Sequence, residues 1–462
     1  MFDASTYIDR RTDLAGRLGS GIALFLGNDE SAMNYRGNPY PFRQDSSFLY
    51  YWGLSGPGLA GVLDVDEDRS LLFGKDPTIE DMVWEGPLPR LADRGALSGV
   101  SETRSVAALA DTLARAAGKG RHIHFLPQYR AETQAKLEGL LFLKPATATE
   151  MVSAQLTRAV IEQRLEKEPQ EIAEINRALD VSYDMHTYAM RTARPGHIER
   201  EVAGAVEGIA NAGGGRLAFP IIFSRHGEIL HNHSYNNELL EGDLVVLDSG
   251  ASSPKGYASD ITRSIPVSGT FTERQKAIYQ LVLDAQLRAI DAMKPGVSFK
   301  DIHLLAARSI AADLKALGLM KGDTDDAVAA GAHALFFPHG LGHHMGLDVH
   351  DLEGLGEDLV GYDDETQRSP QFGLCYLRMG RRLKPGYVLT VEPGCYFIGP
   401  LIDHWKAEGR HTEFINYEAL KAWRGFGGVR IEDDVLVTDD GHLVLGKPIP
   451  KSVALVEAAC AR

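Results

Sequence analysis

Cysteine is scarce in this chain. Its 462 residues include only Cys375, Cys395 and Cys460. Three cysteines cannot build a disulfide framework, and their spacing does not resemble that of metal-binding cysteines. We therefore expect reduced thiols and a cytoplasmic protein.

Long apolar runs and an excess of basic residues are also missing. No stretch of about 18 apolar residues occurs, so we expect no membrane span. The N-terminal sequence MFDASTYIDRRTDLAG has no apolar core, and we expect no secretory signal. The formal net charge is -15, and no basic stripe is present to neutralise phosphates, which argues against a nucleic-acid partner.

The chain is long enough for two domains, and its pattern changes near residue 165. A long amphipathic helix begins near Glu171, with Pro169 suited to its first turn. Before it, strand-like runs alternate with helical patterns, at residues 21–26, 60–65, 70–73 and 122–126 and at residues 106–117 and 132–141. These patterns predict an N-terminal α/β domain over residues 1–164 and a second domain over residues 165–462.

The second domain contains an internal repeat. Residues 242–250 and 386–394 each read as a glycine, five mostly apolar residues, a carboxylate, one residue and another glycine. Arg194-Pro195-Gly196 and Lys294-Pro295-Gly296 are each followed by a helix-like stretch. Similarities this short also arise by chance, so the repeat only supports the idea of two related halves facing each other across a site.

Four carboxylates stand at the ends of strand-like runs. Asp248 ends the run 244–247 and Glu392 follows the run 388–391, while Asp260 precedes residues 261–267 and Glu432 follows residues 429–431. An unpaired charge buried at such a position costs several kcal/mol, so these groups need cationic partners. With His343 they predict a metal site, whose members are Asp248, Asp260, His343, Glu392 and Glu432.

This set of donors indicates the chemistry. Oxygen-rich donors favour Mn²⁺, or Co²⁺ or Fe²⁺, over the thiolate sites that hold structural zinc. Two ions about 3.5–4 Å apart can share carboxylates and a hydroxide that is nucleophilic at neutral pH. A glutamate left partly free can carry a proton to a leaving amine. The residues therefore predict metal-assisted hydrolysis.

Histidines are concentrated beside one of these ligands. Five of the sixteen fall within residues 333–350, in a stretch with flanking glycines that let the backbone approach a site. We expect His343 to bind metal, and His339 and His350 to contact the substrate or stabilise a tetrahedral intermediate. His333 and His344 are interpreted as structural.

Neighbouring acidic residues are alternative ligands. Asp243, Asp433 and Asp434 lie near the candidates, but adjacent residues of a strand point to opposite faces. Arg430 stands two residues before Glu432, on the same face, where it can orient a ligand carboxylate.

Three segments carry a resemblance to a known family. HGLGHHMGLDVHD, LTVEPGCYFI and GFGGVRIEDDVLVTDDG are similar to the signatures of pita-bread metallopeptidases, in the branch of aminopeptidase P and Xaa-Pro dipeptidase (prolidase). The resemblance extends over nearly the whole chain. It implies an α+β protein, with a smaller α/β domain before a C-terminal pita-bread domain.

The resemblance also assigns roles. It implies two divalent ions, Mn²⁺ first, with Co²⁺, Fe²⁺ or Zn²⁺ as alternatives, on the five ligands named above. It implies that Glu392 shuttles the proton and that Arg430 lies beside the last ligand. It further implies that His231, His339 and His350 position the substrate near the metals.

The two subfamilies imply different substrates. Prolidases cleave Xaa-Pro dipeptides, whereas aminopeptidase P accepts longer peptides. The segment RGNPYPFRQDSSFLYYWGL resembles aminopeptidase P, but Arg378 precedes Glu392 where prolidases carry a carboxylate-binding arginine. An arginine fork that meets a terminal carboxylate explains a dipeptide preference. We predict a prolidase, with aminopeptidase P activity as the alternative and a surface position as the alternative for Arg378.

One spacing departs from the family pattern. Asp248 and Asp260 are twelve residues apart, one more than usual. We assign the additional residue to 251–255, where Ser252-Ser253-Pro254 is typical of a hairpin turn. An insertion inside a strand, without a bulge, would turn Asp260 away from the site.

The resemblance implies proline-containing peptide substrates and a homodimer or homotetramer. The stretch Met82-Val83-Trp84-Glu85 is interpreted as core or interface, and at an interface it would close a neighbour's site. Hydrolysis of organophosphate esters is a side activity of some relatives. A metal-free binding protein is the alternative of a different class, and it is disfavoured because all five ligands are kept.

Overall fold

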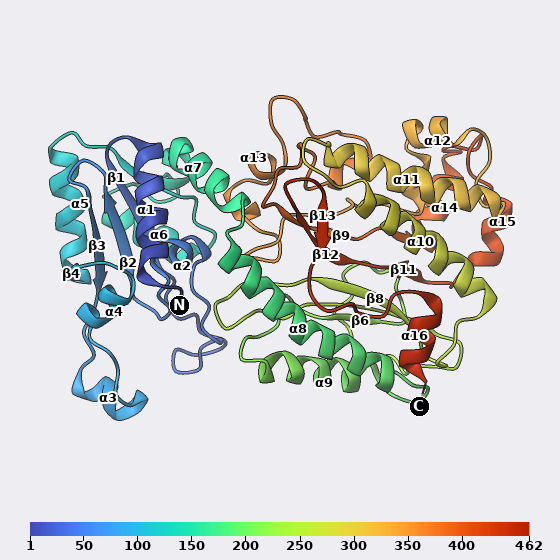
Figure 1. Ribbon diagram of the computed structural model, residues 1–462, viewed down its shortest axis with the longest axis horizontal. Helices are drawn as coiled ribbons and strands as arrows, with labels where there is room; N and C mark the ends of the chain where they lie inside the picture. The colour runs from blue at the N-terminus through green and yellow to red at the C-terminus, as the bar shows by residue number, and fades with distance from the viewer. Residues whose placement is uncertain (462) are drawn as a thin grey trace. The chain divides into compact units, whose positions relative to one another are not determined.

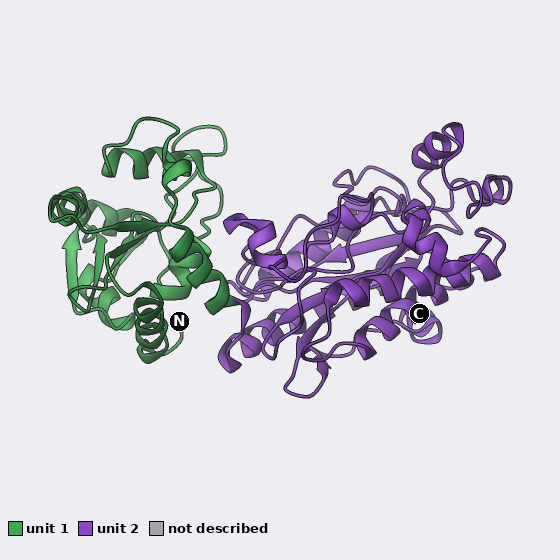
Figure 2. Ribbon diagram, turned by 90° about the horizontal axis from the view of Figure 1, so that it is seen from above, with its two compact units in different colours: residues 1–164 green, residues 165–462 purple. Residues whose placement is uncertain are grey.

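The computed structural model describes residues 1–461. The chain forms two compact units, one of residues 1–164 and a second that begins at Leu165 (Figure 2). In the described part of the chain, no helix has both the length and the apolar character needed to cross a membrane.

Unit 1 is built on a mixed sheet with strand order β4-β3-β2-β1-β5. The strands β1, β2 and β3 pair antiparallel, while β5 joins β1 and β4 joins β3 in parallel. The strands are β1 (Ile22–Leu26), β2 (Ala60–Asp64), β3 (Arg69–Gly74), β4 (Glu102–Ser105) and β5 (Ile123–Phe125). The helices are α1 (Ala4–Leu18), α2 (Ser46–Trp52), α3 (Ile79–Glu85), α4 (Leu91–Leu97), α5 (Leu109–Gly118), α6 (Ala131–Leu140) and α7 (Ala154–Leu165), with 3₁₀ turns η1 (Val106–Ala108) and η2 (Ala148–Met151).

The predicted runs of unit 1 correspond to β1, β2, β3 and β5 and to α5 and α6. The helix α1 has no counterpart among the predictions because its buried face contains Arg10 and Arg11, which interrupt the apolar pattern. Trp84 lies on α3, none of whose residues is buried, and is 81% exposed. The core interpretation of that stretch is therefore wrong.

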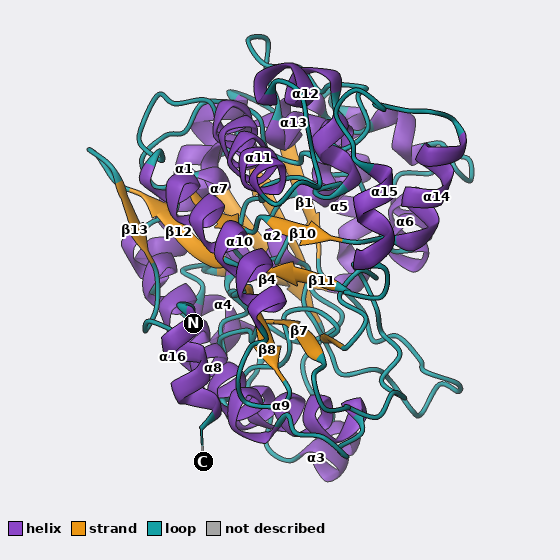
Figure 3. Ribbon diagram, turned by 90° about the vertical axis from the view of Figure 1, so that its right-hand side faces the viewer, coloured by secondary structure: helices purple, strands orange, loops and turns teal. Residues whose placement is uncertain are grey.

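Unit 2 has two three-strand ladders, ordered β6-β7-β8 and β13-β12-β9, and a pair β10-β11. The strands lie between the helix pairs α8–α9 and α10–α11 (Figures 1 and 3). The strands are β6 (Ile222–Ser224), β7 (Leu244–Ser249), β8 (Ile261–Pro266), β9 (Val388–Val391), β10 (Gly394–Tyr396), β11 (Gly428–Arg430), β12 (Asp433–Val437) and β13 (His442–Val444).

The helices of unit 2 include the predicted long one, α8, which starts at Pro169. They are α8 (Pro169–Thr192), α9 (Glu199–Ala212), α10 (Glu273–Asp291), α11 (Phe299–Ala316), α12 (Thr324–Ala330), α13 (Glu357–Gly361), α14 (Gly399–Ala407), α15 (Tyr417–Leu420) and α16 (Val453–Cys460). The 3₁₀ turns are η3 (Ala332–Leu335), η4 (Glu353–Leu355), η5 (Leu374–Tyr376) and η6 (Lys421–Trp423).

The internal repeat has a structural counterpart. The N–H of Gly196, between α8 and α9, donates to the carbonyl of Leu239 at 2.8 Å. The N–H of Gly296, between α10 and α11, donates to the carbonyl of Leu383 at 2.8 Å. Leu239 and Leu383 each precede their copy of the strand motif by three residues. The same helix-pair connection is therefore fixed to the start of β7 in one half and of β9 in the other.

The hairpin β7–β8 keeps one register from end to end. Asp248 pairs with Thr262, and the pairing continues to Ser252 opposite Ala258. The tip is residues 254–256, closed by an N–H bond from Gly256 to Ser253 at 2.8 Å. Because no bulge separates Asp248 from Asp260, both carboxylates lie on the same face. The pairing therefore contains no insertion within a strand that would turn Asp260 away from the site.

Candidate metal centre and active site

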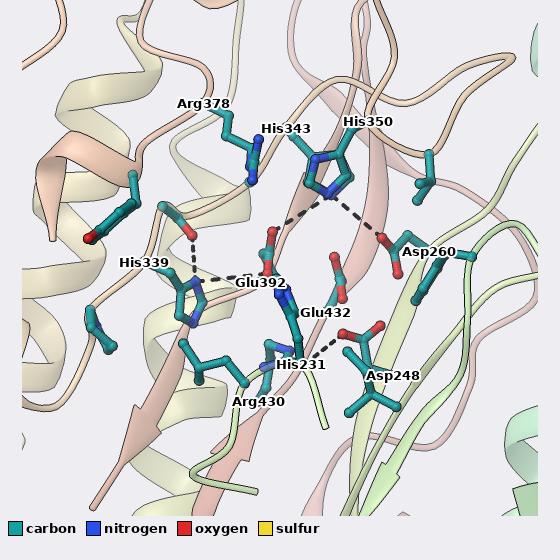
Figure 4. Close-up of a pocket in the computed structure, with 18 of the residues that line it drawn as sticks. His231, Asp248, Asp260, His339, His343, His350, Arg378, Glu392, Arg430 and Glu432 are labelled. Atoms are coloured by element: carbon teal, nitrogen blue, oxygen red, sulfur yellow. Dashed lines mark hydrogen bonds and ion pairs between the residues drawn. The ribbon is translucent and has the colours of Figure 1, made fainter. Parts of the chain in front are cut away.

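A cavity of about 640 Å³ in unit 2 is lined by the residues that the sequence predicts for the site (Figure 4). Its polar wall is formed by the carboxylates and histidines and by two arginines, and its apolar wall includes Phe219, Leu230 and Leu401. The lining includes Phe219, Pro220, Ile222, Leu230, His231, His233, Asp248, Asp260, His339, His343, Val349, His350, Phe372, Tyr376, Arg378, Glu392, Ile398, Leu401, Arg430 and Glu432. All ten sequence-predicted site residues are in this list.

The four carboxylates come from two pairs of antiparallel strands. Asp248 and Asp260 lie on the hairpin β7–β8. The register of β9 with β12 sets Asp433 opposite Val391, which brings Glu392 and Glu432 to facing positions just beyond the ladder. Each half of unit 2 therefore contributes two acidic side chains to the same cavity.

His343 is held by a strand-like segment that runs along β9. Its carbonyl accepts from the N–H of Thr390 at 3.0 Å, and its own N–H donates to the Thr390 hydroxyl at 3.1 Å. The approach needs glycine at position 342, since a Cβ there would lie 2.0 Å from the carbonyl oxygen of Thr390. Backbone pairing thus fixes His343 beside the strand that ends at Glu392.

The tautomer of His343 suits a metal ligand. Its Nδ1 lies 3.1 Å from the carbonyl oxygen of His344, which can only accept, so Nδ1 carries the proton. Its Nε2 then presents a lone pair to the cavity, 3.5 Å from Oδ2 of Asp260 and 3.8 Å from Oε1 of Glu392. Histidine ligands are commonly oriented in this way, through a hydrogen bond from the second nitrogen.

The four carboxylates Asp248, Asp260, Glu392 and Glu432 form an acidic cluster, and some of its oxygen atoms have no partner among residues 1–461 that would balance their charge. Asp248 Oδ1, Asp260 Oδ1 and Glu432 Oε1 are buried without a hydrogen-bond partner among the described residues. Burial, with neighbouring carboxylates, raises the pKa of Asp260 and of Glu432 well above the ordinary values. Donor atoms of Asp260, His343 and Glu432 lie within 4.8 Å of one another. Buried donors of this kind fit divalent cations, which would offset the negative charge.

Arg430 compensates one carboxylate and orders the wall behind the cluster. Its Nη2 donates to Asp248 Oδ2 at 2.5 Å and its Nη1 to the Tyr396 hydroxyl at 2.9 Å. Its Nε donates to the Thr262 hydroxyl at 3.2 Å, and Thr262 donates in turn to Glu432 Oε2 at 2.6 Å. One arginine therefore orients two carboxylates of the cluster, one directly and one through threonine.

His339 is fixed on both sides of its ring. Its Nδ1 donates to the Gly340 carbonyl at 2.8 Å and lies 3.9 Å from Glu392 Oε2, and its Nε2 accepts from the Tyr396 hydroxyl at 2.8 Å. Burial and the charge of Arg430 lower the pKa of His339 to about 3, so its ring is neutral. Burial and Arg430 likewise lower the pKa of His231.

His350 and Arg378 form the opposite wall. The ring of His350 lies 4.0 Å from that of His343, measured between centroids. Arg378 follows η5 and extends into the cavity (Figure 4), with its side chain 35% exposed. It is therefore a cavity residue rather than a surface arginine.

The competing acidic residues have other partners. Asp243 pairs with Arg225 at 2.9 Å, and Asp433 pairs with Arg263 at 2.7 Å. Asp434 lies behind the cluster, where its Oδ2 accepts from the N–H of Asp260 at 3.1 Å. None of the three lines the cavity.

His333 and His344 are buried away from the cavity. His333 lies 6.4 Å from His303 and His344 lies 4.9 Å from Tyr387, both measured between ring centroids. Neither lines the cavity, which agrees with a structural role for both.

Sequence reasoning missed three residues that orient the site. Thr262 and Tyr396 connect Arg430 to Glu432 and to His339, and Glu353 contacts both His350 and Arg378. The alternation along β8 is a usable signal for Thr262, because it shares a face with Asp260. Tyr396 and Glu353 depend on contacts between distant segments and carry no comparable signal.

Comparison with known proteins agrees with this geometry. Residues 7–124 match the aminopeptidase P N-terminal domain. Human Xaa-Pro dipeptidase is 33% identical over 95% of this chain and 88% of its own length. A probable Xaa-Pro aminopeptidase of Botryotinia fuckeliana is 32% identical over 90% of this chain and 85% of its own length.

Solved structures also resemble this chain. The structure of Pseudomonas aeruginosa aminopeptidase PepP superposes with a TM-score of 0.81 at 30% identity, over 99% of this chain and 98% of that one. A substrate complex of an Escherichia coli aminopeptidase P variant gives 0.82 at 30% identity, with the same coverage. Residues 173–439 match metallopeptidase family M24, and the chain belongs to that family.

Proposed function

We propose that this protein hydrolyses the Xaa-Pro bond and prefers Xaa-Pro dipeptides. The observation that carries the proposal is the presence of Arg378 in the same cavity as the four carboxylates and His343. An arginine there can meet the terminal carboxylate of a dipeptide while the acidic cluster faces the bond to be cleaved. Residues 165–462 are proposed as the catalytic domain.

The residues present suit two divalent ions held by Asp248, Asp260, His343, Glu392 and Glu432. When bound, such ions act as Lewis acids and lower the pKa of a coordinated water. We propose Mn²⁺ because the donors are mainly carboxylate oxygens. Metal analysis of the purified protein and reconstitution with Mn²⁺, Co²⁺, Fe²⁺ or Zn²⁺ would test the choice.

Glu392 is proposed to move the proton. Burial raises the pKa of its carboxyl, which places it closer to the range of a general base. It takes a proton from the attacking water and gives it to the proline nitrogen as the C–N bond breaks.

The histidines around Glu392 position the substrate. His339 Nδ1 lies 3.9 Å from Glu392 and limits where that carboxylate can turn. His231 and His350 face the cavity from two different loops, where they can donate to or accept from the substrate's peptide group.

The experiment compares a Xaa-Pro dipeptide with a Xaa-Pro-Xaa tripeptide, for wild type and Arg378→Ala. Dipeptide turnover that falls strongly in the variant, with little tripeptide turnover in either protein, supports the prolidase proposal. Tripeptide turnover that the variant retains supports aminopeptidase P activity instead. That second candidate is favoured by the aminopeptidase P structures that match nearly the whole chain. Cleavage of neither peptide contradicts both.

Two further features of the protein are proposed. Ile79, Val83 and Trp84 on α3 are 79%, 72% and 81% exposed, which suits burial against a second copy in a homodimer or homotetramer. The mass in solution of wild type and Trp84→Ser would test this, and an unchanged oligomer would contradict it. The three free cysteines suit a cytoplasmic protein, which cell fractionation would test.

A further inference from the structure

One carboxylate outside the cavity lining joins two side chains of its wall. Oε2 of Glu353 accepts from Nδ1 of His350 at 3.0 Å and from Nη1 of Arg378 at 2.6 Å. His350 lines the cavity three residues earlier in the chain, whereas Arg378 comes from the loop after η5. Glu353 therefore connects two loops that reach the site from different parts of unit 2.

The contact to His350 determines which nitrogen carries the ring proton. A carboxylate only accepts hydrogen bonds, so Nδ1 of His350 must be the donor. In the neutral ring, Nε2 is then an acceptor with a fixed direction. Without Glu353, the ring could rotate and exchange tautomers.

The contact to Arg378 leaves most of its guanidinium available. Nη1 is shared between Glu353 and Glu357, the latter at 3.0 Å. Within residues 1–461, Nε and Nη2 of Arg378 have no hydrogen-bond partner. That edge of the planar group can still form the paired bonds by which arginine recognises a carboxylate.

Glu353 and Glu357 should differ in how strongly each of them holds Arg378. The side chain of Glu353 is 16% exposed and that of Glu357 is 36% exposed. Glu357 also pairs with Arg368, so its charge is shared. Exposed ion pairs contribute little, whereas shielded hydrogen bonds between charged groups are stronger.

We propose that Glu353 is a positioning residue that fixes both the His350 tautomer and the place of Arg378 through one carboxylate oxygen. It thereby links recognition of a substrate carboxylate to the orientation of a site imidazole. This inference rests on the proposed hydrolysis of Xaa-Pro dipeptides.

The kinetic test uses Glu353→Ala and Glu357→Ala, with Glu365→Ala as a control, because Glu365 pairs with Arg382 and does not line the cavity. The substrates are a Xaa-Pro dipeptide and its Xaa-Pro amide, which lacks the carboxylate. We expect Glu353→Ala to raise the dipeptide KM and lower kcat on both substrates, each by about tenfold. Glu357→Ala should raise only the dipeptide KM, by about threefold. If the wild type cleaves only the dipeptide, the comparison of kcat between these variants still applies.

The conservative variant Glu353→Gln separates positioning from general loss of structure. Its amide oxygen can accept the same two hydrogen bonds, so it should recover part of kcat and KM. Thermal unfolding and metal content of all variants should match the wild type. A kcat for Glu353→Ala equal to that of Glu357→Ala would overturn the proposal.

A second measurement does not depend on activity. Nitrogen-15 NMR of the metal-free protein, with His350 assigned by its loss in His350→Gln, reports which ring nitrogen carries the proton. We expect an Nδ1-protonated ring in wild type and Glu357→Ala, and a mixture in Glu353→Ala. An unchanged tautomer in Glu353→Ala would overturn the positioning of His350. If the wild type cleaves no Xaa-Pro substrate, the proposed function and the recognition role of Glu353 fail together, while the NMR result still decides the contact with His350.

Discussion

Nε2 of His343 lies 3.5 Å from Oδ2 of Asp260, although the two residues belong to different halves of unit 2. Asp260 precedes β8, and His343 lies on the segment paired with β9. Neither nitrogen nor oxygen can donate across this gap when Nδ1 carries the ring proton and the carboxylate is charged. A cation between them would satisfy both, so we expect the two halves to meet at a metal-binding contact.

Replacing Asp260 tests that contact. Asp260→Asn removes a charge and leaves an amide among buried acidic side chains, so metal affinity should fall at least tenfold. Calorimetric titration of metal-free protein with Mn²⁺ would measure the loss. Asp243→Asn, which changes an acid paired with Arg225 outside the cavity, should bind metal like the wild type. Equal affinity of Asp260→Asn and wild type would contradict the assignment.

Metal-free protein should lose stability relative to metal-loaded protein as pH rises. The pKa values of Asp260 and Glu432 are raised in the folded state, so their stabilising contribution is present below their ordinary values near 4 and is lost as pH rises through the raised ones. Between pH 5 and pH 8, Tm of the metal-free protein should therefore fall relative to that of the protein saturated with Mn²⁺. Calorimetry of both forms would measure it. A metal-free Tm that rises across this range, relative to the loaded form, would be the contrary result.

Buried neutral histidines should weaken the fold in acid. Burial lowers the pKa of His186 and His333 to about 4, so each stabilises the protein above its unfolded pKa of 6.5 and loses that contribution as pH falls towards 4. The contribution is on the order of 3 kcal/mol for each group. Urea unfolding at pH 7, 5.5 and 4.5 should show a steeper loss for the wild type than for His333→Phe. Equal losses of unfolding free energy in the wild type and in His333→Phe would contradict this prediction.

Glycine at position 342 should be required for the His343 segment. A Cβ there would lie 2.0 Å from the Thr390 carbonyl, so Gly342→Ala should cost about 1–3 kcal/mol and lower metal affinity. Gly208→Ala is the matched control, because a Cβ on this α9 glycine meets nothing within 4 Å. The control should be neutral or slightly stabilising. Chemical denaturation and metal titration of both variants would measure these effects. Equal stability and metal affinity of the two variants would contradict the requirement for glycine at position 342.

Tyr396 should matter for rate more than for stability. Tyr396→Phe removes the hydroxyl that Arg430 contacts and that donates to His339, so the ring of His339 loses its fixed orientation beside Glu392. We expect kcat to fall about tenfold, with metal content unchanged. Steady-state kinetics would measure this, and Tyr417→Phe, a tyrosine that donates to Arg410 outside the cavity, serves as the control. Equal kcat values for the two variants would contradict the role.

The site was more predictable than the fold around it. Asp248 and Glu392 were found because each ends an apolar strand, and a buried carboxylate needs a partner. Asp434 shows the limit of that rule, since it is buried too but is satisfied in part by the N–H of Asp260. Only the strand register separates the two cases.

In unit 1 the local pattern was a weaker guide. The helix α2 reads SSFLYYW, an aromatic run with the composition of a strand, and packing overrides that preference. The strand β4 reads ETRS and has no apolar pattern, because it forms the edge of the sheet. Such elements are determined by long-range pairing, which a local pattern does not contain.

The most direct test of the central claim measures metal content and Xaa-Pro cleavage in the same sample. Metal-free protein is titrated with Mn²⁺ while hydrolysis of a Xaa-Pro dipeptide is followed, with Asp260→Asn as the comparison. We expect no cleavage without metal, two ions bound per chain at saturation, and activity that rises with binding in the wild type alone. Full activity in the metal-free protein, or metal binding without any cleavage of Xaa-Pro substrates, would contradict it.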